Sequence, residues 1–413
     1  MNNIVTVFEH DSIYINKGYP KLTLEEFKAL QLFHKEKNFP YYDLVNKGVR
    51  FCEYVGVLQV GKLTIEVLPK TDRNNDTKYW RSLLIDMLKS SGIFDTKAPT
   101  SAQLKLKSNF VLNHYFEMFI SEVEQLLHYG LIKRYRKTEQ NSFSLKGKLL
   151  FSKHLSSNFV HHERFYVQHA IYDYEHLFNQ VLLKTLCLLR HINFKHKLSG
   201  RLATLILNFP ELKDIKVSES TFENILYDRK NQGYQKAIEI AKLLLLNYHP
   251  DINGGRNHVL ALMFDMNQLW EKFVLKALQR NNDGKFNIYG QTSKKFWKTK
   301  GGKIKNMKPD IVIESREQQF YILDTKWKNI GESYPSDDDL RQMFTYHKYH
   351  KHAHVFLVYP GERYKILRGA FMNELVNHEE SKNQCSIIKV MISRGNAIGQ
   401  KELAEKIFEF IEI

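Results

Sequence analysis

Apolar positions along the chain follow two different spacings, and the balance between them changes twice. In residues 1 to about 100, short runs with strand-like character are interleaved with stretches of helical periodicity. The short runs predict strands at 4–8, 12–15, 55–60 and 63–68, and the periodic stretches predict helices at 22–33 and 79–90. We therefore expect an N-terminal region that mixes strands and helices.

Helical periodicity dominates from about residue 101 to residue 250. Apolar residues repeat at intervals of three and four over 111–127, 174–192 and 234–246. A basic and aromatic stretch at 131–168 interrupts this pattern, and Pro, Asn and Gly cluster at 247–255 as in a linker. The middle of the chain is predicted to be largely helical, with a basic insertion.

The last third of the chain returns to alternating helices and strands. A helix is expected from Asp265, a plausible N-cap, to Leu278, because its apolar residues form one stripe. Two apolar runs, 311–313 and 320–323, flank a polar turn and predict a hairpin. A helix over 339–346, strands at 355–359 and 386–392, and a helix at 400–412 complete the predicted order.

These patterns predict an α+β protein of several domains. We expect a strand-rich, partner-binding domain at 1–100, a helical region at 101–255, and an α/β nuclease domain with a mixed central sheet at 256–413. A hydrophobic content of 43% excludes a disordered chain, and no apolar run is long enough to span a bilayer. Three scattered cysteines and the absence of a signal-peptide pattern favour a reducing cytoplasm.

A net charge of +16 favours a polyanionic partner, and part of the excess is local. The segment 285–308 holds eight lysines and no acidic residue, and four aromatic residues are interleaved with them. Contact with DNA phosphates is one interpretation, and a solvated lysine-rich hairpin is the other. The lysines expected to bind DNA are Lys294, Lys295, Lys298, Lys300, Lys303 and Lys305.

The predicted hairpin carries three charged residues with the spacing of a phosphodiesterase site. Pro309-Asp310 precedes its first strand, and Asp324 and Lys326 end the second. Residues two apart on a strand point to the same face, so Asp324 and Lys326 should lie together. Two carboxylates can hold Mg²⁺, and an ammonium can orient water or offset charge on the phosphate. Each fragment alone would be ordinary, since strand edges often alternate in charge.

Two neighbouring helices add candidates to this site. Gln342 and Tyr346 are four residues apart and share one helical face. Glu271, beside the apolar stripe of the earlier helix, is either a further metal ligand or a solvated carboxylate. The order Pro-Asp, Asp-x-Lys and Gln-x-x-x-Tyr resembles the PD-(D/E)xK nucleases of the RecB-like group.

Two other patterns are expected to carry no chemistry. His347, His350, His352 and His354 are interpreted as surface charge at a helix C-terminus rather than a zinc site. Gly301-Gly302-Lys303 and Gly254-Gly255-Arg256 lack the spacing of a phosphate-binding loop, so no nucleotide site is expected in this chain.

The whole chain resembles McrC, the nuclease subunit of the McrBC modification-dependent restriction system. The motif residues Asp310, Asp324, Lys326, Gln342 and Tyr346 match that family's catalytic positions. Three further segments are similar to it: 61–70, which ends in Leu-Pro-Lys, 147–151, and the helix start at 265–271.

The resemblance implies a division of labour between two proteins. An McrB-like AAA+ GTPase hexamer would bind GTP and recognise DNA bearing 5-methylcytosine, while this chain would stimulate its GTPase and cleave double-stranded DNA with Mg²⁺. Residues 131–158, with Lys148 and Lys153, are the predicted contact with the GTPase, and a basic loop that caps the core is the alternative. Pairing of two McrC chains would allow both strands to be cut.

Two other functions are compatible with the same residues. One is a stand-alone, RecB-like, Mg²⁺-dependent DNA nuclease, which would cut without a GTPase. The other is a non-catalytic subunit that binds DNA and activates its partner.

Overall fold

The computed structural model divides into two compact units, one of which is discontinuous in sequence. Unit 1 comprises residues 1–112 and 250–413, and unit 2 comprises residues 113–249. The predicted division into three domains stays a prediction. The structure describes residues 3–18, 20–37, 39–61, 63–70, 76–91, 111–192, 197–249, 259–328, 330, 333–350, 353–372, 380–392 and 397–412. Most of the expected linker at 247–255 lies outside these residues.

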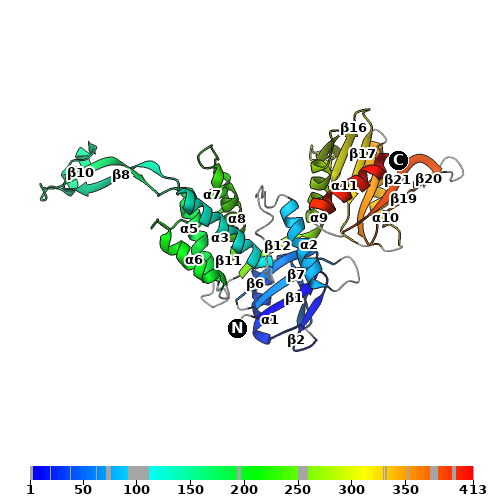
Figure 1. Cartoon of the computed structure of the whole chain (residues 1–413), viewed down its shortest axis with the longest axis horizontal. Coiled ribbons are helices and arrows are strands. Elements are labelled where there is room, and N and C mark those ends of the chain that lie inside the picture. Colours follow the sequence, from blue (N-terminus) through cyan, green and yellow to red (C-terminus); the bar gives the residue numbers. More distant parts are fainter. Residues whose placement is uncertain are drawn as a thin grey trace. The chain divides into compact units, whose positions relative to one another are not determined.

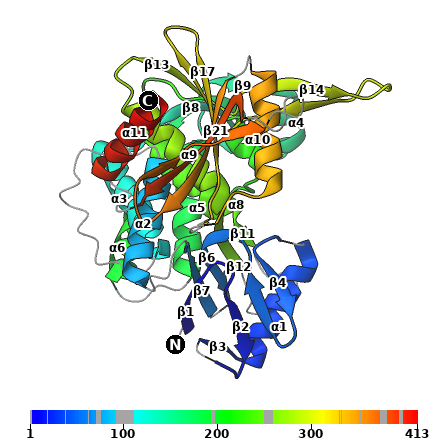
Figure 2. The same cartoon turned by 90° about the vertical axis from the view of Figure 1, so that its right-hand side faces the viewer.

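The N-terminal part of unit 1 forms two small sheets with a shared core (Figure 2). In unit 1 the first sheet runs β1-β7-β6-β12, and the second runs β3-β2-β5-β4. Core residues such as Val5, Leu30 and Ile65 are almost fully buried. The elements are β1 (Asn3–Phe8), β2 (Ser12–Ile15), β3 (Lys21–Leu22), α1 (Leu24–Lys37), β4 (Tyr42–Val45), β5 (Gly48–Phe51), β6 (Tyr54–Val60), β7 (Leu63–Leu68), α2 (Thr77–Ser90) and β12 (Val259–Asp265).

The start of α1 and the closeness of β6 to β12 follow from single residues. Thr23 and Glu26 each accept a hydrogen bond from the other's backbone N–H, and this capping box begins α1. Gly56 in β6 has a φ of 133°, and a Cβ placed there would lie 2.1 Å from the carbonyl oxygen of Leu262 in β12. Only glycine permits this approach of the two backbones.

The C-terminal part of unit 1 is a mixed sheet covered by helices on both faces (Figure 2). The strand order is β13-β16-β17-β18-β21-β19, with β16–β17 antiparallel and β17–β18 and β18–β21 parallel. Helices α9 and α11 pack together on one face, and α10 lies on the other. The elements are α9 (Met266–Arg280), β13 (Phe286–Gly290), β14 (Lys294–Lys298), β15 (Ile304–Met307), β16 (Ile311–Ser315), β17 (Phe320–Thr325), α10 (Asp337–Tyr349), β18 (His354–Gly361), β19 (Lys365–Leu367), β20 (Ala370–Met372), β21 (Glu380–Met391) and α11 (Ala397–Glu412).

Two local predictions for this part of the chain are confirmed, and one is wrong. Asp265 caps α9 by accepting hydrogen bonds from the N–H groups of Asn267 and Gln268. The hairpin of β16 and β17 pairs Ile311 with Leu323, as its apolar runs predicted. The prediction of surface histidines is wrong for His347 and His350, which are each 3% exposed because the C-terminal turn of α10 packs against the sheet. His354 in β18 is exposed, and His352 lies outside the described residues.

Unit 2 is a set of packed helices that carries a long β-hairpin. The helices predicted from periodicity are confirmed as α3 (Val111–Tyr129), α5 (Leu177–His191) and α8 (Gln235–Leu246). The remaining elements are β8 (Arg134–Ser142), β9 (Lys148–Leu149), α4 (Phe151–Ser157), β10 (Phe165–Asp173), α6 (Lys197–Asn208), α7 (Glu219–Glu223), η1 (Gln232–Tyr234) and β11 (Tyr248–His249).

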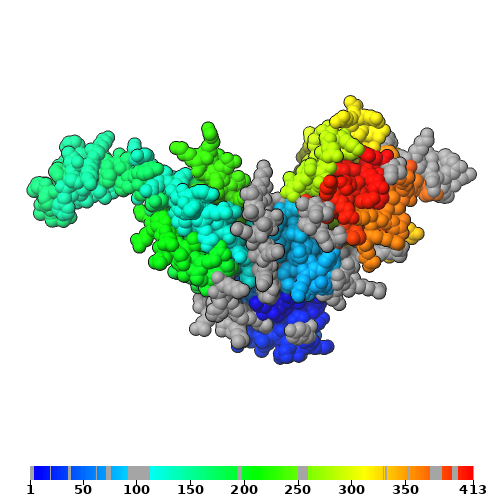
Figure 3. Space-filling model, viewed as in Figure 1, coloured from blue at the N-terminus to red at the C-terminus, as the bar shows by residue number. Residues whose placement is uncertain are grey.

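The basic stretch at 131–168 is part of this hairpin and not a loop that caps the core. Strands β8 and β10 pair antiparallel from Arg134–Asp173 to Ser142–Phe165, and together they extend beyond the helices of unit 2 (Figures 1 and 3). We call residues 134–173 the arm. Most of its side chains are exposed or half-buried, including large apolar residues near its tip.

No helix in the described part of the chain is long and apolar enough to cross a membrane.

Candidate active site

The predicted charged residues meet where β16 begins and β17 ends. Asp310 directly precedes β16, Asp324 lies in β17, and Lys326 follows that strand. The antiparallel pairing of β16 and β17 brings Asp310 beside Thr325, whose N–H and hydroxyl donate to Asp310 Oδ2 at 2.7 and 2.9 Å. The hairpin register therefore fixes the first carboxylate against the strand that carries the second.

A chain of polar contacts joins the hairpin to α10. Lys326 Nζ lies 2.7 Å from Asp324 Oδ2 and donates to Gln342 Oε1 at 3.2 Å. The amide of Gln342 donates to Asp324 Oδ1 at 3.1 Å and to the Tyr346 hydroxyl oxygen at 2.8 Å. Tyr346 in turn donates to the backbone oxygen of Lys308 at 3.1 Å. Gln342 therefore holds both charged groups of the Asp-x-Lys motif, and Tyr346 orients Gln342.

Glu271 on α9 is a buried third carboxylate of this region. It is 9% exposed and accepts a hydrogen bond from Gln291 Nε2 at 3.3 Å. Burial, together with the negative charges of Asp310 and Asp324, raises its pKa to about 7. The burial of Glu271 contradicts the solvated alternative, and its role as a metal ligand stays a prediction.

The site concentrates negative charge away from water. Burial, followed by the charge of Asp310, raises the pKa of Asp324 to about 6, and burial raises the pKa of Asp310 as well. Burial opposes the charged form of Lys326, but the carboxylates of Asp324, Asp310 and Asp339 outweigh it and raise its pKa. A cation among these carboxylates would favour their ionised forms.

The donor set fits Mg²⁺ better than a metal held entirely by protein. Among the described residues, no three His, Cys, Asp or Glu side chains are arranged as a ready metal cage. Mg²⁺ commonly takes one or two carboxylates and keeps several waters, so the buried Asp324 and the half-buried Asp310 are a sufficient set. Asp310 and Asp324 are the residues that would hold it, and a ligand role for Glu271 stays a prediction.

The predicted lysine-rich hairpin exists and is anchored to the end of α10. β14 and β15 pair antiparallel, and all six of the lysines predicted to bind DNA are exposed. Lys294 Nζ lies 3.1 Å from His350 Nδ1. The rings of Phe296 and Tyr349 pack edge to face, with their centroids 5.1 Å apart. Burial, and then the charge of Lys294, lowers the pKa of His350 to about 4, so its ring is neutral at pH 7.

The other predicted contact residues, Lys148 and Lys153, lie on the arm in unit 2. Lys148 is in β9, and Lys153, in α4, forms an ion pair with Glu139 of β8. They belong to a different unit from the site around Asp324.

Sequence patterns missed several residues of the site. Asp339, at the start of α10, accepts from Lys328 at 2.7 Å and from Tyr359 at 3.1 Å. Thr325 holds Asp310, and Trp327 Nε1 donates to Glu9 Oε1 at 2.7 Å. One local signal existed: Lys328 follows Lys326 at the same two-residue spacing that separates Lys326 from Asp324. The contacts with residues from distant segments have no signal in the local sequence.

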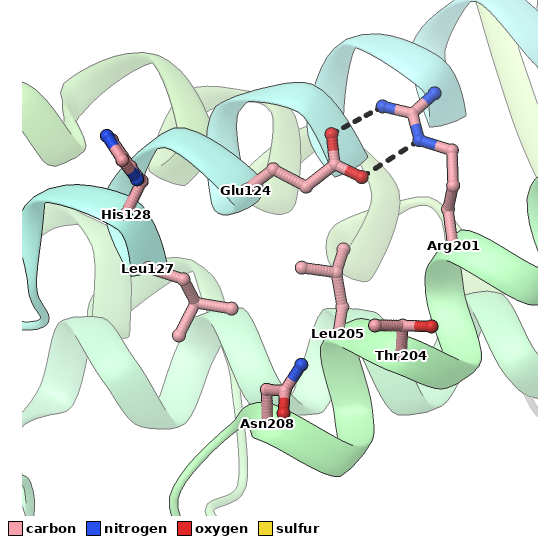
Figure 4. A pocket seen from close by; sticks show the side chains of 7 residues that line it. All are labelled: Glu124, Leu127, His128, Arg201, Thr204, Leu205 and Asn208. Carbon is pink, nitrogen blue, oxygen red and sulfur yellow. Dashed lines mark hydrogen bonds and ion pairs between the residues drawn. The ribbon is translucent and has the colours of Figure 1, made fainter.

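A pocket in unit 2 is separate in sequence from these residues (Figure 4). Arg201 of α6 donates to both carboxylate oxygens of Glu124 in α3 at 2.8 and 2.6 Å. This bidentate pair joins two helices across the pocket wall.

Fold and site together define a mixed α+β protein with several sheets and a partly buried cluster of carboxylates and lysine at the end of a central hairpin. The family model described as McrBC 5-methylcytosine restriction system component matches residues 49–360, and the chain belongs to this family. The resemblance to McrC seen in the sequence is therefore confirmed. No curated protein sequence matches the chain significantly.

Two solved structures have a similar fold. One is the refined half-complex from a tetradecameric assembly of Thermococcus gammatolerans McrB AAA+ hexamers with bound McrC. It matches with a TM-score of 0.72 at 18% identity, over 99% of this chain and 100% of that chain. The other is the cryo-EM structure of the Thermococcus gammatolerans McrBC complex, with a TM-score of 0.50 at 21% identity, over 68% of this chain and 88% of that chain.

Proposed function

We propose that this chain is the Mg²⁺-dependent DNA endonuclease subunit of a modification-dependent restriction complex, with a nuclease domain of the PD-(D/E)xK type. The observation that carries the proposal is the set of contacts joining Asp324, Lys326, Gln342 and Tyr346 beside the half-buried Asp310. Family membership supports the restriction system, and the site supports hydrolysis of a phosphodiester as its chemistry.

In the proposed reaction the chain's residues divide into holding and neutralising roles. Asp310 and Asp324 would hold the metal, which would supply an activated water and neutralise charge on the phosphate. Lys326, kept ammonium by its carboxylate neighbours, offsets the charge that develops on the phosphate oxygens. Gln342 fixes the distance between Asp324 and Lys326, so both groups are in place before substrate arrives.

The exposed lysine-rich hairpin supplies contacts to double-stranded DNA. Its six lysines carry no neighbouring acidic residue in sequence, and the anchoring of Lys294 and Phe296 to the end of α10 joins the hairpin to the helix that carries Gln342. Ammonium contacts to phosphate are independent of sequence, so this surface would bind DNA without selecting a site.

A separate AAA+ GTPase hexamer provides GTP hydrolysis and recognition of 5-methylcytosine in this proposal. Support comes from the two Thermococcus gammatolerans structures of similar fold, one described as McrB AAA+ hexamers with bound McrC and the other as the McrBC complex. The arm suits the contact with the GTPase, because Phe151, Leu155, Phe159 and Val160 near its tip are 64–80% exposed. Lys148 and Lys153 lie in the same part of the arm, and pairing of two such complexes would let both DNA strands be cut.

The decisive experiment is cleavage of methylated plasmid by the chain with its GTPase partner, GTP and Mg²⁺. The wild-type complex should cut, and Asp324→Ala should abolish cutting while stimulation of the GTPase persists. Asp338→Ala is the matched control, because the Asp338 side chain on α10 is 91% exposed and, among the described residues, forms an ion pair with Arg341 alone, at 3.0 Å.

Three outcomes would contradict parts of the proposal. Cutting by Asp324→Ala at the wild-type rate would overturn the site. Cutting by the chain alone with Mg²⁺ would favour a stand-alone nuclease. Stimulation of the GTPase with no cutting under any condition would favour a non-catalytic activating subunit.

A further inference from the structure

Asp339 is a buried carboxylate that the Asp-x-Lys and Gln-x-x-x-Tyr motifs do not include. It lies in the first turn of α10, is 8% exposed, and its N–H donates to the capping Ser336 hydroxyl at 3.3 Å. Its side chain accepts from Lys328 Nζ at 2.7 Å and from the Tyr359 hydroxyl of β18 at 3.1 Å. The adjacent acidic residues of the same turn, Asp337 and Asp338, are exposed.

Asp339 is also the second acidic partner of Lys326. Among the described residues, Lys326 Nζ forms ion pairs with Asp324 at 2.7 Å and with Asp339 at 4.0 Å. A cation bound by Asp324 would compete with Lys326 for that carboxylate. Asp339 would then remain as the negative charge that keeps the ammonium in place.

Lys328 differs from Lys326 in its access to solvent. Its side chain is 45% exposed, whereas that of Lys326 is 25% exposed, and Asp339 is the one acidic group among the described residues with which Lys328 pairs. The Lys328 ammonium also lies 5.9 Å from the centre of the Tyr359 ring, the residue that donates to Asp339. Lys328 is therefore held at one end by a rigid buried carboxylate and remains open to a ligand.

We propose that Asp339 is a positioning residue that holds Lys326 and Lys328 together, and that Lys328 binds a DNA phosphate next to the one that is cut. The proposal rests on the nuclease function proposed above and assigns that site a second phosphate contact. Two lysines on one carboxylate set the spacing between two phosphate contacts, and Tyr359 fixes that carboxylate to the central sheet.

The test compares Asp339→Asn with Asp338→Asn in the full chain with its GTPase partner. Both substitutions remove one negative charge from the first turn of α10, so their effects on net charge and on the interaction with the helix dipole should be alike. Asparagine at 339 can still accept a hydrogen bond from Tyr359. A role through bulk charge alone predicts equal DNA binding by the two variants, or slightly tighter binding than wild type.

The positioning role predicts a difference in two measurements. Asp339→Asn should reduce the rate of cleavage at saturating DNA by about tenfold, as loss of groups that orient ligands typically does. It should also lower the salt slope of DNA binding, measured without Mg²⁺ on a short duplex, by roughly one unit, the loss of one phosphate contact. Lys328→Gln should show the same loss of slope, and the double variant should lose no more than either alone.

Each result decides between the proposals. If Asp339→Asn matches Asp338→Asn in both rate and slope, the positioning role is overturned. If Asp339→Asn does not fold, Lys328→Gln tests the phosphate contact instead, because an exposed side chain can be replaced without disturbing the core. An unchanged salt slope of DNA binding in Lys328→Gln overturns that contact. If the wild-type complex does not cut DNA at all, the nuclease function fails, and the salt slopes still test the contact made by Lys328.

Discussion

Lys326 contacts Asp324 and Gln342 at once, so its ammonium is placed before any substrate binds. The two aspartates that would hold the metal have other supports: Thr325 donates to Asp310, and Gln342 donates to Asp324. Removing the lysine therefore leaves the proposed metal ligands with their own hydrogen bonds, and binding can be separated from chemistry.

We predict that Lys326→Ala retains Mg²⁺ binding and assembly with the GTPase while cleavage falls at least about a hundredfold. Arginine should not restore activity, because its planar fork places charge differently from a compact ammonium. Asp310→Ala should weaken both metal binding and cleavage. Calorimetric titration with Mg²⁺ beside a plasmid-cutting assay measures the two effects, and equal loss of metal binding in the two variants would refute the separate roles.

At the scale of elements, local pattern predicted most of the described helices and the hairpin of β16 and β17. These succeeded because their apolar residues face a core at a spacing of two, three or four positions. Strands β8 and β10 were missed for a physical reason. The residues of β8 are mostly exposed and those of β10 mostly half-buried, so neither strand has one buried face that would impose an alternation of apolar and polar residues.

Within the site, the sequence predicted contacts between residues close in the chain and missed contacts between residues far apart in it. The Asp324–Lys326 and Gln342–Tyr346 pairs are two and four residues apart, and the regular geometry of a strand and a helix brings each pair together. Glu9 and Trp327 are 318 residues apart, so only the packing of whole elements could place them in contact.

The fixed approach of β6 to β12 makes a prediction about Gly56. Gly56→Ala adds a Cβ that overlaps the Leu262 carbonyl oxygen and forces a β-carbon onto a φ of 133°, so it should destabilise unit 1 by at least about 2 kcal/mol. Gly284→Ala is the matched control, since Gly284 also has a positive φ but nothing lies within 4 Å of its added Cβ. Denaturant unfolding measures the stability of both variants. Equal losses of unfolding free energy would show that the overlap with the Leu262 carbonyl oxygen does not destabilise the protein.

At the scale of the whole molecule, Glu9 joins the end of β1 to the segment that follows Lys326. Its Oε1 accepts from the Lys70 N–H at 2.8 Å and from Trp327 Nε1 at 2.7 Å, and it is 5% exposed. Its other oxygen is buried and accepts no hydrogen bond from the described residues. Burial raises the pKa of Glu9 from 4.5 to about 7.

This raised pKa gives stability a definite dependence on pH. The folded state holds a proton that the unfolded state loses above pH 4.5, so the contribution of Glu9 is full below 4.5 and lost as pH rises to about 7. The total change is on the order of 3 kcal/mol at most. Glu9→Gln should remove this part of the slope. Unfolding midpoints of the wild type and Glu9→Gln at pH 5, 6, 7 and 8 test this prediction. A difference between the two midpoints that stays constant with pH would contradict it.

The discontinuity of unit 1 also has a consequence for how the chain is made. Strand β6 leaves the ribosome early, but its neighbour β12 is synthesised roughly 200 residues later, which at about 5–20 residues per second takes about 10–40 s. Until then one edge of β6, a strand that is buried along nearly its whole length in the finished fold, has no partner. Unit 2 is contiguous and can fold during this wait. A chain that terminates after unit 2 and before β12 would keep that open edge and should aggregate. Such a truncation would therefore harm the folded N-terminal part of unit 1 as well as removing the residues around Asp324.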